Sequence, residues 1–216
     1  MRKIYLDFDG TVVDVWNRYF KVLDDFLGRN GFGRIDIEAY KSRKKRRMLD
    51  HEIVKELTKQ ELNVEKYVEF KREALEAKEY LRLDSLIGKP PDYVGVFHQA
   101  GFLVEILSQR RNKENFLGQI ESLKLASVFD AYIVVEPCAG KNAKYQYLCD
   151  KACKGDVMIG DSIQEKECAG KCGISFLFVD SGLYGTQAIG DAKIYRDITE
   201  IESICKDETK MQDLFM

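Results

Sequence analysis

The chain of 216 residues has 34 Lys and Arg against 36 Asp and Glu, and 45% of its residues are hydrophobic. This composition excludes a disordered or fibrous protein, and the formal charge of -2 excludes a global charge excess that would attract nucleic acid or anionic lipid. The length suits one α/β domain with room for an inserted subdomain.

Apolar periodicity in the first 100 residues predicts a strand followed by a series of helices. A short apolar run that ends at the turn residues Asp9-Gly10-Thr11 indicates a buried strand. Helical intervals then recur without period-2 alternation until Gly88-Lys89-Pro90-Pro91 breaks the pattern. In chain order we expect a strand at 3–8, a helix at 15–27, a helical block within 36–83 and a helix at 92–100.

Strands and helices alternate in the second half of the sequence. Helices of such length between strands predict a parallel sheet with right-handed crossovers. The expected fold is α/β with helices on both faces of the sheet, a core of residues 1–14 and 88–216, and an all-helical cap inserted at 15–87. The expected elements are strands at 102–107, 131–135, 156–159, 174–179 and 192–195, and helices at 113–123, 143–152 and 165–171.

The sequence shows no pattern typical of export or membrane insertion. An apolar run begins at residue 4 and is broken by Asp7, unlike a signal peptide or a membrane span. The six cysteines lie between Cys138 and Cys205 without the spacing of zinc knuckles, so we expect reduced thiols. We therefore predict a cytoplasmic protein with no membrane partner.

Polar residues follow four of the expected strands. Ligands of parallel sheets bind beyond the carboxyl ends of the strands, so residues at these ends converge although they are far apart in sequence. They are Asp7-Phe8-Asp9-Gly10-Thr11 after the first strand, Ser108 after the second, Lys141 and Lys144 after the third, and Gly160-Asp161-Ser162 with Glu165 after the fourth.

In this order and context, the four segments resemble the motifs of the haloacid dehalogenase superfamily. Its phosphatase members have an Asp-x-Asp-Gly-Thr strand end, a Ser or Thr after the second strand, a Lys, and a final Gly-Asp-x-x-x-Asp. The resemblance implies a Rossmann-like core and a helical cap inserted after the first motif. It covers roughly residues 1–14 and 90–200, whereas the helices between them match only as a cap.

The resemblance also implies a role for each motif. Asp7 would attack phosphorus to form an aspartyl-phosphate, which divides a very slow hydrolysis into two steps. Asp9 would protonate the leaving oxygen and then deprotonate water, and we expect Asp7, Asp161 and partial burial to raise its pKa. Ser108 would donate a hydrogen bond to a phosphoryl oxygen, while a Lys neutralises charge and holds Asp7.

Carboxylates that face an anionic phosphate need a compensating cation, and oxygen ligands favour Mg²⁺. By the resemblance, the metal ligands are Asp7, the main-chain carbonyl of Asp9, and Asp161. The family usually has Asp where this chain has Glu165. Whether Glu165 contacts the metal directly or through water stays open.

The lysine and the remaining substrate contacts are less closely defined. We prefer Lys144, which begins the expected helix at 143–152, and keep Lys141 as the alternative because it follows the small pair Ala139-Gly140. The residues that adjoin the first two motifs are candidate substrate contacts: Gly10, Thr11, Gln109 and Arg110.

The most unusual local charge feature is a basic run in the expected cap, Lys41-Ser42-Arg43-Lys44-Lys45-Arg46-Arg47. A solvated helix face is the simpler interpretation. The alternative is a patch above the active site that attracts a polyanionic substrate such as a nucleotide or bisphosphate. No aromatic residue interleaves the run, so we do not expect nucleic acid as a partner.

We therefore predict a Mg²⁺-dependent phosphomonoester hydrolase that acts on a small phosphorylated metabolite through an aspartyl-phosphate. A sugar phosphomutase of the same superfamily shares all four motifs, and the sequence does not separate the two. A non-catalytic, nucleic-acid-associated module is a third hypothesis, against which the intact Asp7, Asp9 and Asp161 argue. The sequence predicts neither the particular substrate nor the oligomeric state.

Overall fold

The computed structural model describes residues 1–140, 142–186, 189–190, 192–207 and 214. Its centre is a six-stranded sheet in the order β5-β4-β1-β6-β7-β8, in which each neighbouring pair is parallel. The predicted α/β fold is confirmed. The strands are β1 (Arg2–Leu6), β4 (Phe102–Gln109), β5 (Ala131–Val135), β6 (Val157–Gly160), β7 (Ser175–Val179) and β8 (Ile194–Tyr195).

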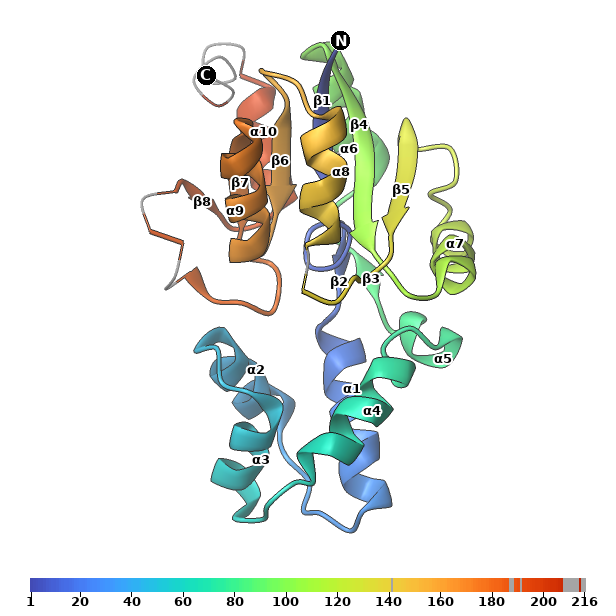
Figure 1. Cartoon of the computed structure of the whole chain (residues 1–216), viewed down its shortest axis with the longest axis vertical. Helices are drawn as coiled ribbons and strands as arrows, with labels where there is room; N and C mark the ends of the chain where they lie inside the picture. Colours follow the sequence, from blue (N-terminus) through green and yellow to red (C-terminus); the bar gives the residue numbers. More distant parts are fainter. Residues whose placement is uncertain (141, 187–188, 191, 208–213, 215–216) are drawn as a thin grey trace.

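Helices cover both faces of this sheet (Figure 1). Side chains alternate along β1, so Ile4 and Leu6 pack in one apolar cluster while Tyr5 packs in another. The first cluster includes side chains of α6 (Pro90–Gln99), α7 (Lys113–Ser122) and α10 (Ile198–Cys205). The second includes side chains of α8 (Ala143–Lys151) and α9 (Ile163–Cys172). A central strand buried on both faces is typical of such parallel sheets.

A lobe of helices lies beyond the carboxyl ends of the strands, in the lower half of Figure 1. The helices expected within residues 36–83 are present. Two short strands, β2 (Val13–Asp14) and β3 (Ser85–Leu86), pair antiparallel where the chain leaves and re-enters the sheet region. The helices are α1 (Trp16–Arg29), α2 (Ile37–Lys45), α3 (Asp50–Thr58), α4 (Val64–Ala74) and α5 (Lys78–Leu81).

None of the helices in the described ranges is both long and apolar enough to cross a membrane. The two short strands β2 and β3 and the helix α10 have no counterpart among the sequence-based expectations. Two-residue strands are too short to give a period-2 signal, and this limit explains the first omission.

One buried carboxylate, that of Asp50, joins three helices of the lobe. It accepts hydrogen bonds from the Tyr40 hydroxyl at 3.2 Å and the Tyr67 hydroxyl at 2.7 Å, and it pairs with the ammonium groups of Lys44 and Lys71. Burial raises the pKa of this carboxyl, but the two lysines outweigh burial and hold it well below its usual range. Lys44, from the basic run, therefore has a structural partner.

We expect Asp50→Ala to lower the free energy of unfolding by about 3 kcal/mol, because it leaves two buried hydroxyls and two lysines without their acceptor. Glu38→Ala, which removes an exposed pair with Lys41, should cost less than about 1 kcal/mol. Urea titrations measure both values. Because the pKa of Asp50 is lower in the folded chain than in the unfolded one, the effect of Asp50→Ala should shrink as the pH falls below about 4. An equal cost for the two variants would contradict the assignment.

Candidate active site

Asp7 directly continues the central strand. Its amide donates to the Ile159 carbonyl at 2.9 Å, which extends the ladder between β1 and β6 by one bond. The carboxylate accepts at Oδ1 from Lys144 Nζ at 2.6 Å and from the Phe8 amide at 2.7 Å. Within the described part of the chain, Oδ2 has no hydrogen-bond donor. The carboxylate is thus fixed through one oxygen while the other stays open.

The chain turns sharply after Asp7. The Phe8 carbonyl accepts from the amides of Val12 and Val13 at 2.9 and 3.1 Å. Gly10 lies within this turn, where its amide donates to the Val13 carbonyl and its own carbonyl accepts from Ser181 Oγ at 2.6 Å. Thr11 is fully buried. Gly10 and Thr11 therefore shape the turn, and neither lines the cavity described below, in contrast to their expected role as substrate contacts.

Lys144 lies in the first turn of α8, which Asn142 caps by accepting the Tyr145 amide. Its buried ammonium lies 2.6 Å from Asp7 Oδ1 and 2.5 Å from Glu165 Oε1. The geometry therefore places Lys144 beside Asp7, as preferred from the sequence. The alternative, Lys141, lies outside the described residues.

Glu165 has two structural partners besides any metal. One carboxylate oxygen pairs with Lys144, and the other accepts the Ser162 amide at 3.2 Å. The Ser162 hydroxyl in turn accepts the Glu165 amide, so the two residues form a capping box at the start of α9. The single side chain of Glu165 therefore both caps α9 and holds Lys144.

Three carboxylates form an acidic group at the carboxyl ends of β1 and β6: Asp7, Asp161 and Glu165 can place one oxygen each within 4.8 Å of one another. Burial and the charge of Glu165 raise the pKa of Asp7 to about 7, and burial together with Glu165 and Asp7 raises that of Asp161. When all three carboxyls are ionised, their negative charges face one positive charge among the described residues, that of Lys144. A divalent cation with a preference for oxygen ligands would balance the remaining two, so these residues fit Mg²⁺.

The environment of Asp9 differs from the expected one. Arg110 contacts both of its carboxylate oxygens at 2.5 and 3.0 Å, and Arg18 Nη2 lies 2.6 Å from Oδ2. Burial alone would raise the pKa of Asp9, but the two guanidiniums outweigh it and hold the pKa well below its usual range. The expectation of a raised pKa is therefore wrong for this conformation, in which Asp9 is ionised.

A cavity of about 260 Å³ contains these groups. Ser108, at the end of β4 and almost fully buried, lines it, as do the candidate substrate contacts Gln109 and Arg110. Tyr19 from α1 of the lobe and Tyr184 from the loop after β7 also line it. The cavity is therefore lined by polar residues at the strand ends and by two tyrosines.

The loop formed by residues 180–185 links the sheet to the helical lobe. Lys45 Nζ from α2 contacts the Asp180 carboxylate at 2.6 Å. A Cβ on Gly182 would lie 1.5 Å from Asp161 Oδ2, and a Cβ on Gly185 would lie 2.0 Å from the Lys45 carbonyl oxygen. Both positions therefore require glycine, because any side chain would overlap a neighbour.

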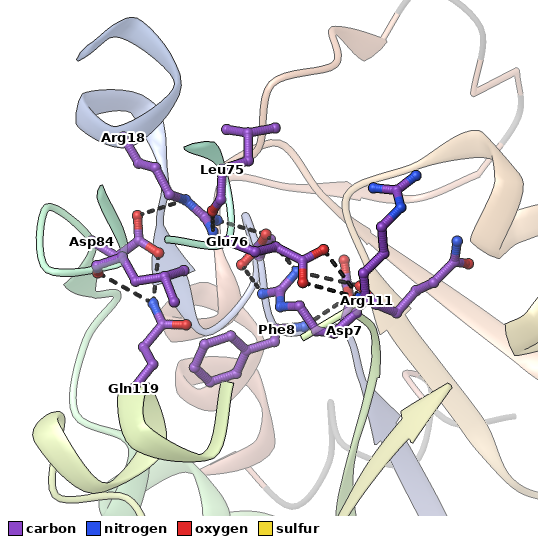
Figure 2. A network of polar contacts seen from close by, with 12 residues as sticks. Asp7, Phe8, Arg18, Leu75, Glu76, Asp84, Arg111 and Gln119 are labelled. Atoms are coloured by element: carbon purple, nitrogen blue, oxygen red, sulfur yellow. Dashed lines mark hydrogen bonds and ion pairs between the residues drawn. The ribbon is translucent and has the colours of Figure 1, made fainter. Parts of the chain in front are cut away.

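Sequence reasoning missed Arg18 and Asp84, which form a buried ion pair at 3.1 Å. The signal was present for Arg18: it lies among the apolar residues of the helix at 15–27, on a face that also buries Val22. A charged residue on an apolar helix face needs a buried partner. Figure 2 shows Arg18 pointing toward Asp84, which Gln119 approaches from α7.

The fold and the site together define an α/β protein with an acidic centre at the carboxyl edge of a parallel sheet. A family model for haloacid dehalogenase-like hydrolases matches residues 4–179. The match spans most of the chain, so the chain belongs to this family. The resemblance found in the motifs is confirmed. A search of curated proteins finds no match.

Solved structures show the same fold. A protein from Bacteroides fragilis, provisionally named a haloacid dehalogenase-like hydrolase, has 21% identity and a TM-score of 0.67, over 93% of this chain and 100% of the other. A predicted phosphatase from Clostridium acetobutylicum has 16% identity and a TM-score of 0.66, over 94% and 96%. A Thermotoga maritima protein provisionally named a β-phosphoglucomutase has 16% identity and a TM-score of 0.66, over 96% and 99%.

We expect Lys144→Met to lower the free energy of unfolding by about 3 kcal/mol without metal, because it leaves the buried carboxylates with no cation. Added MgCl₂ should restore more stability to this variant than to the wild type, since binding to the folded state stabilises it. Lys151→Met, an exposed change on the same helix, is the control. Thermal unfolding with and without MgCl₂ measures the effect. A Mg²⁺ response of equal size in all three proteins would contradict the assigned acidic site.

Proposed function

We propose that the protein is a Mg²⁺-dependent phosphomonoester hydrolase that acts on a small phosphorylated metabolite through an aspartyl-phosphate. The observation that carries this proposal is the position of Asp7, whose carboxylate contacts Lys144 in a cavity that also contains an acidic group suited to a divalent cation. Residues 15–87 would act as the cap over this cavity. A cytoplasmic location stays a prediction from the sequence.

Asp7, Asp161 and the Asp9 main-chain carbonyl would hold the Mg²⁺. Glu165 would contact the ion either directly or through a water molecule. When bound, the ion would neutralise charge on the phosphate and the carboxylates. Lys144 keeps Asp7 in place through Oδ1, which leaves Oδ2 to attack phosphorus. Lys144 and the Ser108 hydroxyl would bind phosphoryl oxygens.

Asp9 gives up one proton in the first step and regains one in the second. In the first, Asp7 forms a bond to phosphorus, the bond to the leaving oxygen breaks, and Asp9 donates a proton to that oxygen. In the second, Asp9 takes a proton from water, whose oxygen attacks phosphorus and releases Asp7 and orthophosphate. The ionised Asp9 of this conformation is the form required for the second step. The first step requires the Asp9 carboxyl to take up a proton, which is favoured when its contact with Arg110 loosens.

A sugar phosphomutase is the second candidate, because it would use the same aspartyl-phosphate and the same four motifs. The fold shared with the provisionally named β-phosphoglucomutase is compatible with it. The two differ in the acceptor: water in the hydrolase, a sugar hydroxyl in the mutase.

We expect the wild type to release phosphate from p-nitrophenyl phosphate only when Mg²⁺ is present, and EDTA to stop the reaction. Asp7→Asn should lower kcat by at least about 10⁴-fold, because the amide cannot form the acyl-phosphate. Asp92→Asn, which changes an exposed carboxyl in the first turn of α6, is the control. Phosphate release is the measurement, and full turnover by Asp7→Asn would sink the nucleophile assignment.

The basic run is only partly available to a substrate. Four of its side chains have acidic partners, whereas Arg46 and Arg47 are exposed and form no ion pair with a described residue. Arg47 lines a small cavity with Ser162, Gln164 and Tyr184, three residues that also line the active-site cavity. This position supports Arg47 as the contact for a second anionic group on the substrate.

We expect Arg47→Ala to raise KM about tenfold for a nucleotide or bisphosphate, the factor that corresponds to about 1.4 kcal/mol for a lost charge-assisted contact. The KM for p-nitrophenyl phosphate should not change. Arg46→Ala is the matched control, since it removes the same charge one residue away. Steady-state kinetics with both substrate types decide the matter. Equal KM values for the two variants would contradict a substrate contact by Arg47 and would favour the interpretation of the basic run as a solvated helix face.

A further inference from the structure

Arg18 is among the largest fully buried side chains in the described residues, and it comes from the lobe rather than from the sheet. Its guanidinium has three partners in different parts of the chain. Nη2 lies 2.6 Å from Asp9 Oδ2, Nε lies 3.1 Å from Asp84 Oδ1, and Nη1 donates to the Leu75 carbonyl at 3.1 Å. Figure 2 shows Arg18, Asp84 and Leu75 grouped beside the turn after β1.

Asp84 fixes Arg18 in this position. Its side chain is fully inaccessible to solvent, and its second oxygen accepts from Gln119 Nε2 at 2.7 Å. Asp84 directly precedes β3, where the chain re-enters the sheet region, and Gln119, which holds its carboxylate, lies on α7 of the core. Burial raises the pKa of Asp84 to about 7 and the charge of Arg18 opposes this rise, so Arg18 has an anionic partner besides Asp9 when Asp84 is ionised.

The two guanidiniums on Asp9 differ in their access to the cavity. Arg110 is one of the lining residues, so a substrate group can contact it. Arg18 does not line the cavity, and its side chain is buried next to Asp9. If a substrate group displaced Arg110, Arg18 would still hold the Asp9 carboxylate at Oδ2.

We propose that Arg18, immobilised by Asp84, is a positioning residue that orients the Asp9 carboxyl for proton transfer to the leaving oxygen. The inference rests on the proposed role of Asp9 as the acid/base of a phosphohydrolase. Because Arg18 belongs to α1, correct orientation of Asp9 also requires the helical lobe to be docked on the sheet.

The basicity of the leaving oxygen provides a direct test. A nitrophenolate leaves readily without a proton, whereas an alkoxide depends on a positioned acid, whose contribution is about 10²–10⁴-fold. We expect Arg18→Met to lower kcat about 100-fold on an alkyl phosphate and less than about fivefold on p-nitrophenyl phosphate. Arg18→Lys should recover part of the loss, because the ammonium keeps the charge but cannot contact both carboxylates as a planar fork does.

Arg29→Met is the matched control, since it removes an exposed guanidinium from the last turn of the same helix. Its kcat on both substrates should equal that of the wild type. Asp84→Asn is the second variant, because it keeps the shape of the side chain while removing the charge that fixes Arg18. We expect it to lower kcat for the alkyl phosphate more than for the aryl phosphate. This variant tests the proposal even if Arg18→Met does not fold.

Equal losses on the two substrates in both variants would overturn the positioning role and leave a purely structural one. Unchanged kinetics in both would overturn it as well. Failure of the proposed function gives a different pattern, namely a wild type that releases no phosphate or an Asp7→Asn variant that retains activity. The two kinds of failure are therefore distinguished in the same set of assays.

Discussion

Burial of acidic groups at one edge of the sheet is the constraint that organises the rest of the molecule. Asp7, Asp9, Asp161 and Glu165 meet where β1 and β6 end, and carboxylates out of water need cations nearby. The four carboxylates fall into two sets that differ in their cationic partners. Among the described residues, Asp9 has two guanidiniums as partners, whereas the other three share one ammonium, that of Lys144. The deficit is thus confined to the place where a divalent cation fits.

This division also links the two lobes. One guanidinium on Asp9 comes from Arg110, directly after β4 in the core, and the other comes from Arg18 on α1 in the helical lobe. On the opposite side, Lys45 from α2 contacts Asp180 after β7. Asp50 in turn holds α2, which carries Lys45, together with α3 and α4.

The strand ends were predictable from sequence because local signals define them. An apolar run followed by Asp-x-Asp-Gly-Thr indicates both a buried strand and a turn. The parallel topology then places Ser108 and Asp161 at the same edge of the sheet. Lys144 could be preferred over Lys141 because helix position is readable from periodicity. These inferences need only short sequence segments and the rule that the carboxyl ends of parallel strands lie at one edge of the sheet.

The environment of each residue was not predictable in the same way. The lowered pKa of Asp9 depends on Arg110, which is 101 residues away in the sequence. It also depends on Arg18, which lies on α1, and the sequence does not give the direction of this helix. The capping role of Glu165 was readable in principle, since Ser162 lies three residues earlier, but its contact with Lys144 depends on the packing of α8 against α9. Long-range contacts of this kind follow from the assembled fold.

The loop at 180–185 has a consequence for how such a protein can diversify. Gly182 and Gly185 admit no side chain, because Asp161 and the Lys45 carbonyl occupy the space. Between them, Leu183 and Tyr184 both line the active-site cavity. Between these two glycines, substitution is therefore confined to Leu183 and Tyr184, so the lining of the cavity can change while the glycines beside Asp161 and Lys45 stay constant.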